Sequence, residues 1–227
     1  MKKVLTTIML LSLIAVATPS FAQLTKEQKK ERKEMSKMTK NQLNEKASKT
    51  ARKEAKQLKK QGWLVSPGTL PIDKQLDKSY NMQFEIDKDM MPKYIMAEAM
   101  SVGENYDAAK LQATELAKLN LAGQIQTEVT ALVESTVAND QLPQEKANSI
   151  TRTIAASKTL ISQRIGRTIP IVELYRVKKD KNKEVLVRIA YDTESAMAVA
   201  KQVLKEELEK KGEDLHKELD QMMASKR

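Results

Sequence analysis

Residues 94–129 read YIMAEAMSVGENYDAAKLQATELAKLNLAGQIQTEV, and the change of pattern within this stretch indicates the class of fold. Residues 94–102 predict a strand that ends at Gly103. Asp107 then fits an N-cap, and apolar side chains recur every four residues after it, which predicts a long helix. Leu116 and Leu132 widen the apolar stripe of this helix. The repeating positions are Ala109, Ala113, Ala117, Leu121, Ile125, Val129, Val133 and Val137.

Shorter elements are expected on the C-terminal side of this helix. Pro143 interrupts the helical pattern, and Gly166 and Gly212 end two later segments. We expect a helix, the two strands of a hairpin and two further helices at residues 144–161, 168–177, 184–191, 193–211 and 213–225. The predicted fold class is α+β, with a three-stranded antiparallel-type sheet in the order β-α-α-β-β-α-α, preceded by a long basic helix. Such a sheet has open edges that an oligomer can cover.

The composition of the 227-residue chain argues against several kinds of chemistry. The chain has no cysteine, which excludes disulfides, thiol nucleophiles, cysteine-ligated zinc and iron–sulfur clusters. Its one histidine, His216, cannot form a multi-histidine metal site within one chain and argues against a histidine-based triad. No glycine-rich phosphate loop, dinucleotide fingerprint or Gly-x-Ser-x-Gly motif occurs. We therefore expect no enzymatic activity, no metal and no cofactor.

The N-terminus has the pattern of a secretory signal peptide. Two lysines precede an almost unbroken apolar stretch at residues 4–17, and residues 20–22 provide the small side chains that a signal peptidase recognises. The stretch is shorter than the about 20 apolar residues that a membrane-spanning helix needs. Gln23 stands where a lipoprotein would carry cysteine. We expect cleavage after Ala22, a location in the periplasm or at the outer-membrane periphery, and no transmembrane segment after processing.

Positive charge is concentrated in residues 23–61. This segment carries 14 basic and 5 acidic residues, a net charge of +9, whereas residues 62–227 carry a net charge of −1. It lacks glycine and proline, and its weak apolar line is rich in alanine. These features predict a basic helical arm that can lie against a domain but cannot hold a tight coiled coil.

Two interpretations of the arm stay open. It is either a solvated spacer or a binder of an anionic lipid or polysaccharide surface in the cell envelope. An aromatic content of 4% and the expected export argue against nucleic acid as a partner. The candidate surface-binding residues are Lys29, Lys30, Arg32, Lys33, Arg52, Lys53, Lys56, Lys59 and Lys60.

Residues 62–90 have the pattern of an irregular segment that lies across the body of the protein. Pro67-Gly68 predicts a turn and Pro71 a second bend, and the large apolar side chains of the segment follow no strict period. Trp63 is expected to pack as an anchor. The alternative is a docking patch for a partner, formed by Trp63, Pro67 and Leu70.

Two stretches resemble the LPP20 family of exported bacterial proteins. In residues 94–129 a strand and a loop precede an alanine-rich helix with a closing Leu-Ala-x-x-Ile, and the second stretch is the hairpin VELYRVKKDKNKEVLVRIAYD at 172–192. The block KEAKQLKKQGWLVSPGTLPIDKQL at 53–76 is similar to one found before such domains in Bacteroidetes proteins. The resemblance covers about residues 53–211 and implies a fold like that of the Tip-alpha toxin-like proteins, whose topology is also β-α-α-β-β-α-α. Relatives are surface or periplasmic proteins, and the lipoprotein members carry a lipidated cysteine that this chain lacks.

These patterns divide the chain into five segments: a signal peptide (1–22), a basic helical arm (23–61), an irregular strap (62–90), an LPP20-like α+β domain (91–211) and a C-terminal helical tail (212–227). We expect an exported cell-envelope protein that self-associates and acts as a non-enzymatic binding or assembly module. The alternative is a peripheral binder of an anionic envelope surface, lipid or polysaccharide, through the basic arm. Another envelope protein is a further candidate partner.

Overall fold

The computed structural model describes residues 26–27, 29–30, 33–34, 37, 44–139, 141–212 and 214–224. The chain divides into two units, residues 1–45 and residues 46–227. In the first unit, the described residues between 26 and 37 are helical, but residues 45–48 are not helical and α2 begins only at Lys49. The expectation of one long basic helix over residues 23–61 is therefore wrong, because Ser48 caps a separate helix. The expected signal peptide, residues 1–22, lies outside the described residues.

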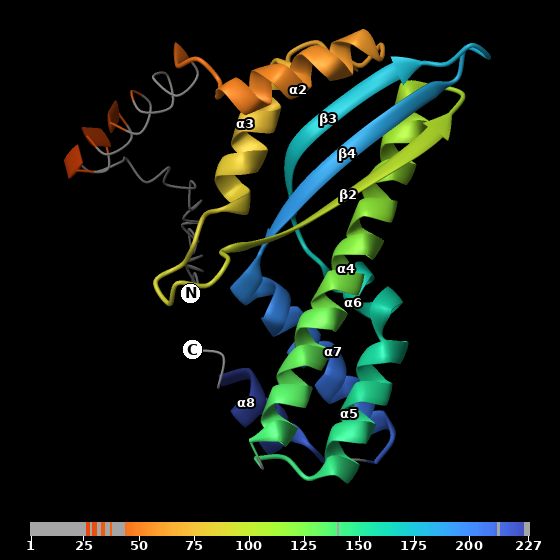
Figure 1. Cartoon of the computed structure of the whole chain (residues 1–227). Coiled ribbons are helices and arrows are strands. Elements are labelled where there is room, and N and C mark those ends of the chain that lie inside the picture. Colours follow the sequence, from red (N-terminus) through yellow and green to blue (C-terminus); the bar gives the residue numbers. More distant parts are fainter. Residues whose placement is uncertain are drawn as a thin grey trace, which may run out of the picture. The chain divides into compact units, whose positions relative to one another are not determined.

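The second unit has an α+β fold, which confirms the expected class (Figure 1). Its described residues form seven helices and four strands. The helices are α2 (Lys49–Lys60), α3 (Ile72–Gln83), α4 (Tyr106–Ala138), α5 (Gln144–Ala156), α6 (Lys158–Arg164), α7 (Thr193–Lys210) and α8 (His216–Ala224). The strands are β1 (Leu64–Val65), β2 (Tyr94–Gly103), β3 (Ile169–Val177) and β4 (Lys183–Asp192). Across the part of the chain that the structure describes, we find no helix with the length and apolar character of a membrane span.

The sheet has four strands in the order β1-β3-β4-β2, and every neighbouring pair is antiparallel. The expectation of three strands is therefore wrong. The additional strand, β1, has only two residues, too few to show the alternation by which a strand is identified in a sequence. The pairing of β2 with β4 is continuous from Tyr94 opposite Asp192 to Gly103 opposite Lys183.

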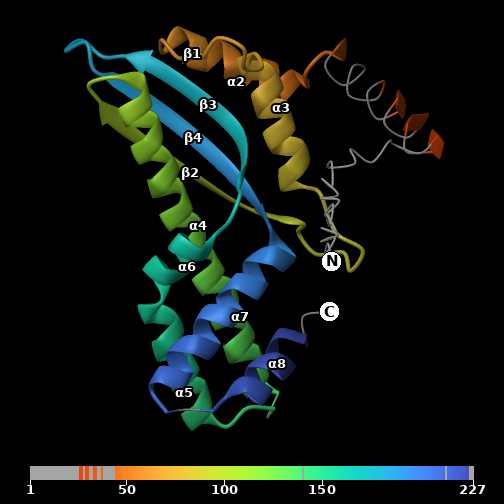
Figure 2. The ribbon, with the colours of Figure 1, turned by 180° about the vertical axis from the view of Figure 1, so that it is seen from behind.

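One face of the sheet is covered by α4, which packs on β2 and β4, while α5, α6, α7 and α8 pack against α4 (Figure 2). The predicted apolar face of this helix is buried from Ala109 to Val133, which confirms the long helix. A Cβ atom on Gly103 would lie 2.8 Å from the backbone nitrogen of Ala109, so the strand and the helix approach closely only because residue 103 is glycine. The N-cap is Asn105 and not the expected Asp107, because the Asn105 side chain accepts a hydrogen bond from the N–H of Ala108 at 2.8 Å.

The opposite face of the sheet is covered by α2 and α3, and Figure 1 shows α3 and α4 on opposite sides of the strands. The alanine line of the expected arm packs here, with Ala51 and Ala55 buried. The C-terminal part of residues 23–61 is therefore a component of the folded unit, since α2 joins the same apolar cluster as Trp63.

Residues 62–90 are not irregular throughout, because they contain the twelve-residue helix α3. Its buried positions follow a helical spacing, but two of them are polar and hide that spacing in the sequence. The buried residues are Ile72, Gln75, Leu76, Ser79 and Met82.

The helices at the end of α4 also differ from the expectation. The single helix expected at 144–161 is divided into α5 and α6 at Ser157, whose hydroxyl donates to the carbonyl of Thr153 at 2.7 Å. The start of α7 is confirmed, since the Asp192 side chain accepts from the N–H of Ser195 at 2.8 Å. From β2 onward the order is β-α-α-α-β-β-α-α, so the expected order lacked one helix.

Candidate interaction site at the free edge of the sheet

The outer edge of β2 is an open edge of the sheet. β2 is a terminal strand, and among the described residues it pairs only with β4. The N–H of Thr193 donates to the carbonyl of Lys93 at 2.9 Å, and this bond continues the β2–β4 ladder, so the odd-numbered residues of β2 bond to β4. The N–H and C=O groups of the even-numbered residues point away from β4. These residues are Tyr94, Met96, Glu98, Met100 and Val102.

A side chain of α4 shields this edge at one point. The amide nitrogen of Asn120 donates to the carbonyl of Glu98 at 2.9 Å, in agreement with the outward direction of that carbonyl. Two turns earlier on the same side of α4, the amide oxygen of Gln112 accepts a hydrogen bond from the hydroxyl of Ser101. Leu116 lies one helical turn from each of these two residues, so it is level with the middle of β2.

Apolar side chains border the open edge on both faces of the sheet. Met100 is 53% exposed and Val102 40% exposed, and as even-numbered residues they lie on the face opposite α4. Leu116, expected to widen the buried stripe of α4, is 39% exposed instead. A strand added to this edge would cover apolar surface on both sides.

A hollow of about 690 Å³ lies along the other half of the same edge, at residues 94–98. Tyr80 of α3 and Gln124 of α4 line it from opposite faces of the sheet, so the hollow surrounds the edge of the strand. This arrangement leaves room for an extended chain beside the first half of β2.

The charged groups of the hollow are paired. The guanidinium of Arg188 contacts the Glu98 carboxylate at 2.7 Å and donates to the Ser79 hydroxyl at 2.8 Å. Tyr80 donates to the Glu54 carboxylate, and this hydrogen bond raises the pKa of the Tyr80 hydroxyl. Since these groups satisfy one another, the hollow has the character of a packing surface.

The opposite edge of the sheet, at β3, is closed. β1 pairs with β3 at Leu174 and Tyr175 and then ends. The N–H of Glu173, the next residue of β3, donates to Oε1 of Gln75 at 2.7 Å. The Gln75 side chain also donates to the carbonyl of Leu70 at 2.7 Å and is only 3% exposed. A buried amide thus takes the place of the strand that is missing beyond β1.

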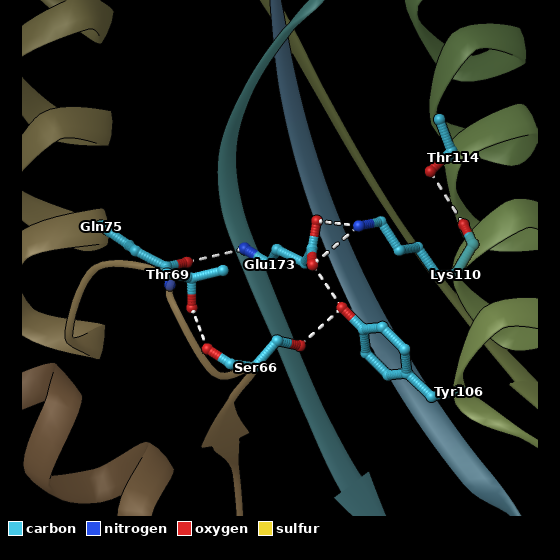
Figure 3. A network of polar contacts seen from close by, with 7 residues as sticks. All are labelled: Ser66, Thr69, Gln75, Tyr106, Lys110, Thr114 and Glu173. Atoms are coloured by element: carbon cyan, nitrogen blue, oxygen red, sulfur yellow. Dashed lines mark hydrogen bonds and ion pairs between the residues drawn. The ribbon is translucent and has the colours of Figure 1, made fainter.

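A network of polar side chains ties this closed edge to α4 (Figure 3). The Glu173 carboxylate accepts hydrogen bonds from the Tyr106 hydroxyl and from Nζ of Lys110, the latter at 2.9 Å. Ser66, which follows β1, donates to the Tyr106 oxygen at 2.6 Å. Burial and the bond to Glu173 raise the pKa of the Tyr106 hydroxyl, and the bond to Glu173 raises the pKa of the Lys110 ammonium group. The members satisfy one another, so the network holds the fold together.

The candidate surface-binding residues fall into both units of the chain. In the first unit Lys29, Lys30 and Lys33 are exposed, and Arg32 lies outside the described residues. In the second unit all five candidates on α2 are exposed, and within the described residues no ion pair engages them. They are Arg52, Lys53, Lys56, Lys59 and Lys60.

The three residues of the alternative docking patch have different environments. Trp63 is 3% exposed, and the Arg176 guanidinium lies 4.7 Å from the centre of its ring. Leu70 is half-buried and Pro67 is exposed. The indole of Trp63 is therefore a core group and is not available to a docking partner, because helices and the sheet cover it.

The only histidine of the chain lies on the surface of α8. Nε2 of His216 contacts the Glu209 carboxylate at 2.6 Å. Over the residues described here, no group of three or more histidine and acidic side chains is arranged to hold a metal ion.

Comparisons with protein-family models, with curated proteins and with solved structures find no match. The similarity to the LPP20 family therefore stays a prediction from the sequence, and a function has to be argued from the geometry of this chain.

Proposed function

We propose that this protein is an exported cell-envelope component that acts as a non-enzymatic assembly module and self-associates through the open edge of β2. One observation carries the proposal: a ten-residue edge strand has one side that pairs with no strand of the described residues, and exposed apolar side chains, Met100, Val102 and Leu116, lie beside it. An unpaired strand edge is a template for pairing with another chain.

The sequence of β2 supports the use of this edge, because it lacks the features that usually prevent pairing. Natural edge strands are commonly protected by lysine, by proline, by a bulge or by extreme shortness. β2 contains no lysine and no proline, and its pairing with β4 has no break in register. Glu98 is its only charged residue, and Arg188 pairs with it.

Light scattering on the mature chain, beginning at Gln23, tests the proposal. We expect an oligomer in the unmodified protein and a shift toward monomer in Met100→Lys, because a lysine at this position charges the apolar border of the edge. Leu111→Lys is the matched control, since Leu111 is 66% exposed and lies on the side of α4 away from the sheet. A monomeric unmodified protein, or equal behaviour of the two variants, contradicts the proposal.

Export is tested separately. Fractionation of cells that express the full chain, followed by N-terminal sequencing, is expected to find the protein in the periplasm or at the outer membrane with Gln23 as its first residue. Recovery in the cytoplasm with residues 1–22 intact contradicts this part of the proposal.

A second candidate function, binding to an anionic envelope surface, is favoured by the exposed basic face of α2. Ala51 and Ala55 are buried, whereas the basic side chains of the same helix face solvent. Vesicles that contain phosphatidylglycerol test it: binding is expected to fall steeply with ionic strength and to weaken in a Lys56→Gln, Lys59→Gln, Lys60→Gln variant. The control replaces Lys178, Lys179 and Lys181, which lie in the turn between β3 and β4, with glutamine. Binding that is insensitive to salt excludes this function.

A further inference from the structure

We infer that the partner at the open edge is a second copy of this chain, whose β2 pairs antiparallel with the first β2 about a two-fold axis at Ala99. The inference rests on the proposed self-association and adds to it the symmetry axis and the register of the paired strands. The result is one continuous sheet shared by two copies.

The hydrogen-bonding pattern of β2 limits the possible registers. Within the described part of the chain, the N–H and C=O groups that point away from β4 belong to the even-numbered residues of β2, so a ladder forms only when even-numbered residues of the two copies face each other. Axes at residues 97, 98, 99 and 100 meet this condition near the middle of the strand, and those at 98 and 99 pair the longest part of β2.

Charge, apolar burial and the length of the ladder distinguish these four axes. An axis at residue 98 places two Glu98 side chains directly opposite, and like charges in that position are destabilising. An axis at residue 97 leaves Val102 outside the ladder, although it is 40% exposed. An axis at residue 100 leaves residues 94–96, which border the hollow, without a partner strand. An axis at residue 99 places Met96 opposite Val102 and Glu98 opposite Met100, so both exposed apolar residues are covered.

The position of α4 agrees with the axis at Ala99. Gln112 is bonded to Ser101 and Asn120 to Glu98, so Leu116, between them on the helix, is level with Ala99. Strands lie about 4.8 Å apart, and α4 packs on β2 and β4, which places the α4 helices of two copies about 10 Å apart. Helices pack side by side at about this distance. The two Leu116 side chains then meet at the axis, which explains their exposure in one copy.

The hollow beside residues 94–98 supplies the space that this register needs. About an axis at Ala99, the end of the partner's β2 from Met100 onward runs beside this half of the strand. The side chains at the odd positions in the middle of the paired segment are small, namely Ala97, Ala99 and Ser101. The Glu98 carbonyl exchanges the exposed Asn120 amide for the backbone N–H of Met100 in the second copy.

Cysteine cross-linking tests the axis directly, because the natural chain contains no cysteine. In Ala99→Cys the two thiols occupy a non-hydrogen-bonded pair, where the Cα atoms lie about 4.5 Å apart, within the range of a disulfide. Under mild oxidation we expect most of this variant to run as a disulfide-linked dimer. Leu111→Cys, the exposed control on the far side of α4, is expected to stay at background.

A mixture of two single-cysteine variants tests the register at exposed positions. Both positions lie on the face of the sheet opposite α4, so the substitutions do not disturb the packing of that helix. Glu98→Cys and Met100→Cys are expected to cross-link when mixed, and neither is expected to cross-link alone. Cross-linking of Glu98→Cys alone indicates an axis at residue 98 and overturns the inference.

The outcomes separate the inference from the function on which it rests. A protein that is dimeric by light scattering but shows no disulfide in Ala99→Cys and none in the mixed sample overturns the inference and leaves the assembly function standing. A protein that is monomeric at every concentration overturns both.

Discussion

The two edges of this sheet are built differently, and the difference shows what is needed to close an edge. At the β3 edge, β1 and the Gln75 amide cover the strand, and the Tyr106–Glu173–Lys110 network ties it to α4. At the β2 edge a single amide, that of Asn120, contacts one carbonyl. Both edges have a side-chain amide on the backbone, so the hydrogen bond alone does not close an edge.

Burial is the property that separates the two amides. Gln75 belongs to α3 and is 3% exposed, so its hydrogen bond to β3 is shielded from water. Asn120 is exposed, and water can replace its hydrogen bond to the Glu98 carbonyl. β1 and Gln75, the groups that cover the β3 strand itself, both belong to residues 62–83, so this segment works as a cover for the sheet. β2 has no such cover among the described residues.

The largest effect on stability is expected at Trp63, which anchors the covering segment 62–83 in the core. Trp63→Ala removes a large side chain that is 3% exposed, and such truncations lower the free energy of unfolding by about 3–5 kcal/mol. Urea denaturation followed by circular dichroism measures the change. Leu64→Ala is the control, because Leu64, the first residue of β1, follows Trp63 in the chain but is 49% exposed. A loss below about 1 kcal/mol in Trp63→Ala means that the indole does not hold the cover in place.

A smaller loss is expected when the buried amide of the closed edge is removed. Gln75→Ala leaves the N–H of Glu173 and the carbonyl of Leu70 without their partner. Unsatisfied buried groups cost about 1–3 kcal/mol, and the same denaturation experiment measures this. Hydrogen exchange at the Glu173 amide is expected to accelerate as well, and unchanged exchange there argues that another group covers the β3 edge.

The closed edge is also expected to weaken at high pH. The folded state raises the pKa of Tyr106 and of Lys110, so it favours the protonated form of both groups. The stability that this contributes is fully present below the ordinary pKa values, about 10.0 for tyrosine and 10.4 for lysine, and is lost as the pH rises through the raised values. Unfolding measured between about pH 8 and pH 11 is expected to show a steeper loss in the natural protein than in Tyr106→Phe. Parallel curves for the two proteins contradict this role of Tyr106.

The smallest effect on stability is expected at the open edge. Asn120→Ala removes an exposed amide, so the free energy of unfolding changes by less than about 0.5 kcal/mol. Because the Glu98 carbonyl loses its shield, self-association is expected to become tighter, by light scattering over a range of concentrations. A large loss of stability in Asn120→Ala would mean that Asn120 stabilises the fold as Gln75 does, and would contradict the contrast between the two edges.

Much of the fold is predictable from periodic apolar residues, and the elements that the sequence did not predict were missed for physical reasons. The long helix α4 and the hairpin of β3 and β4 are evident because their buried faces are apolar and regular. α3 is concealed because Gln75 and Ser79 occupy buried positions, where their polar groups find partners in other elements. β1 is too short to have a period.

The candidate site was predictable only in outline. An open edge is expected of any small sheet, but the sequence does not show which strand is last. Leu116 has the spacing of a core residue, and its exposure depends on where α4 crosses the edge of β2. Met100 and Val102 alternate as in any half-covered strand, and only the structure shows that they are exposed beside an open edge.

The β2–β4 pairing has a consequence for biogenesis. Tyr94 pairs with Asp192, so β2 leaves the ribosome long before β4, its neighbour in the described sheet, exists. Contacts between residues so distant in the chain form late and slow the search for the native topology. During that interval β2 has two unsatisfied edges in place of one, and incomplete chains are therefore more prone to aggregate than finished ones.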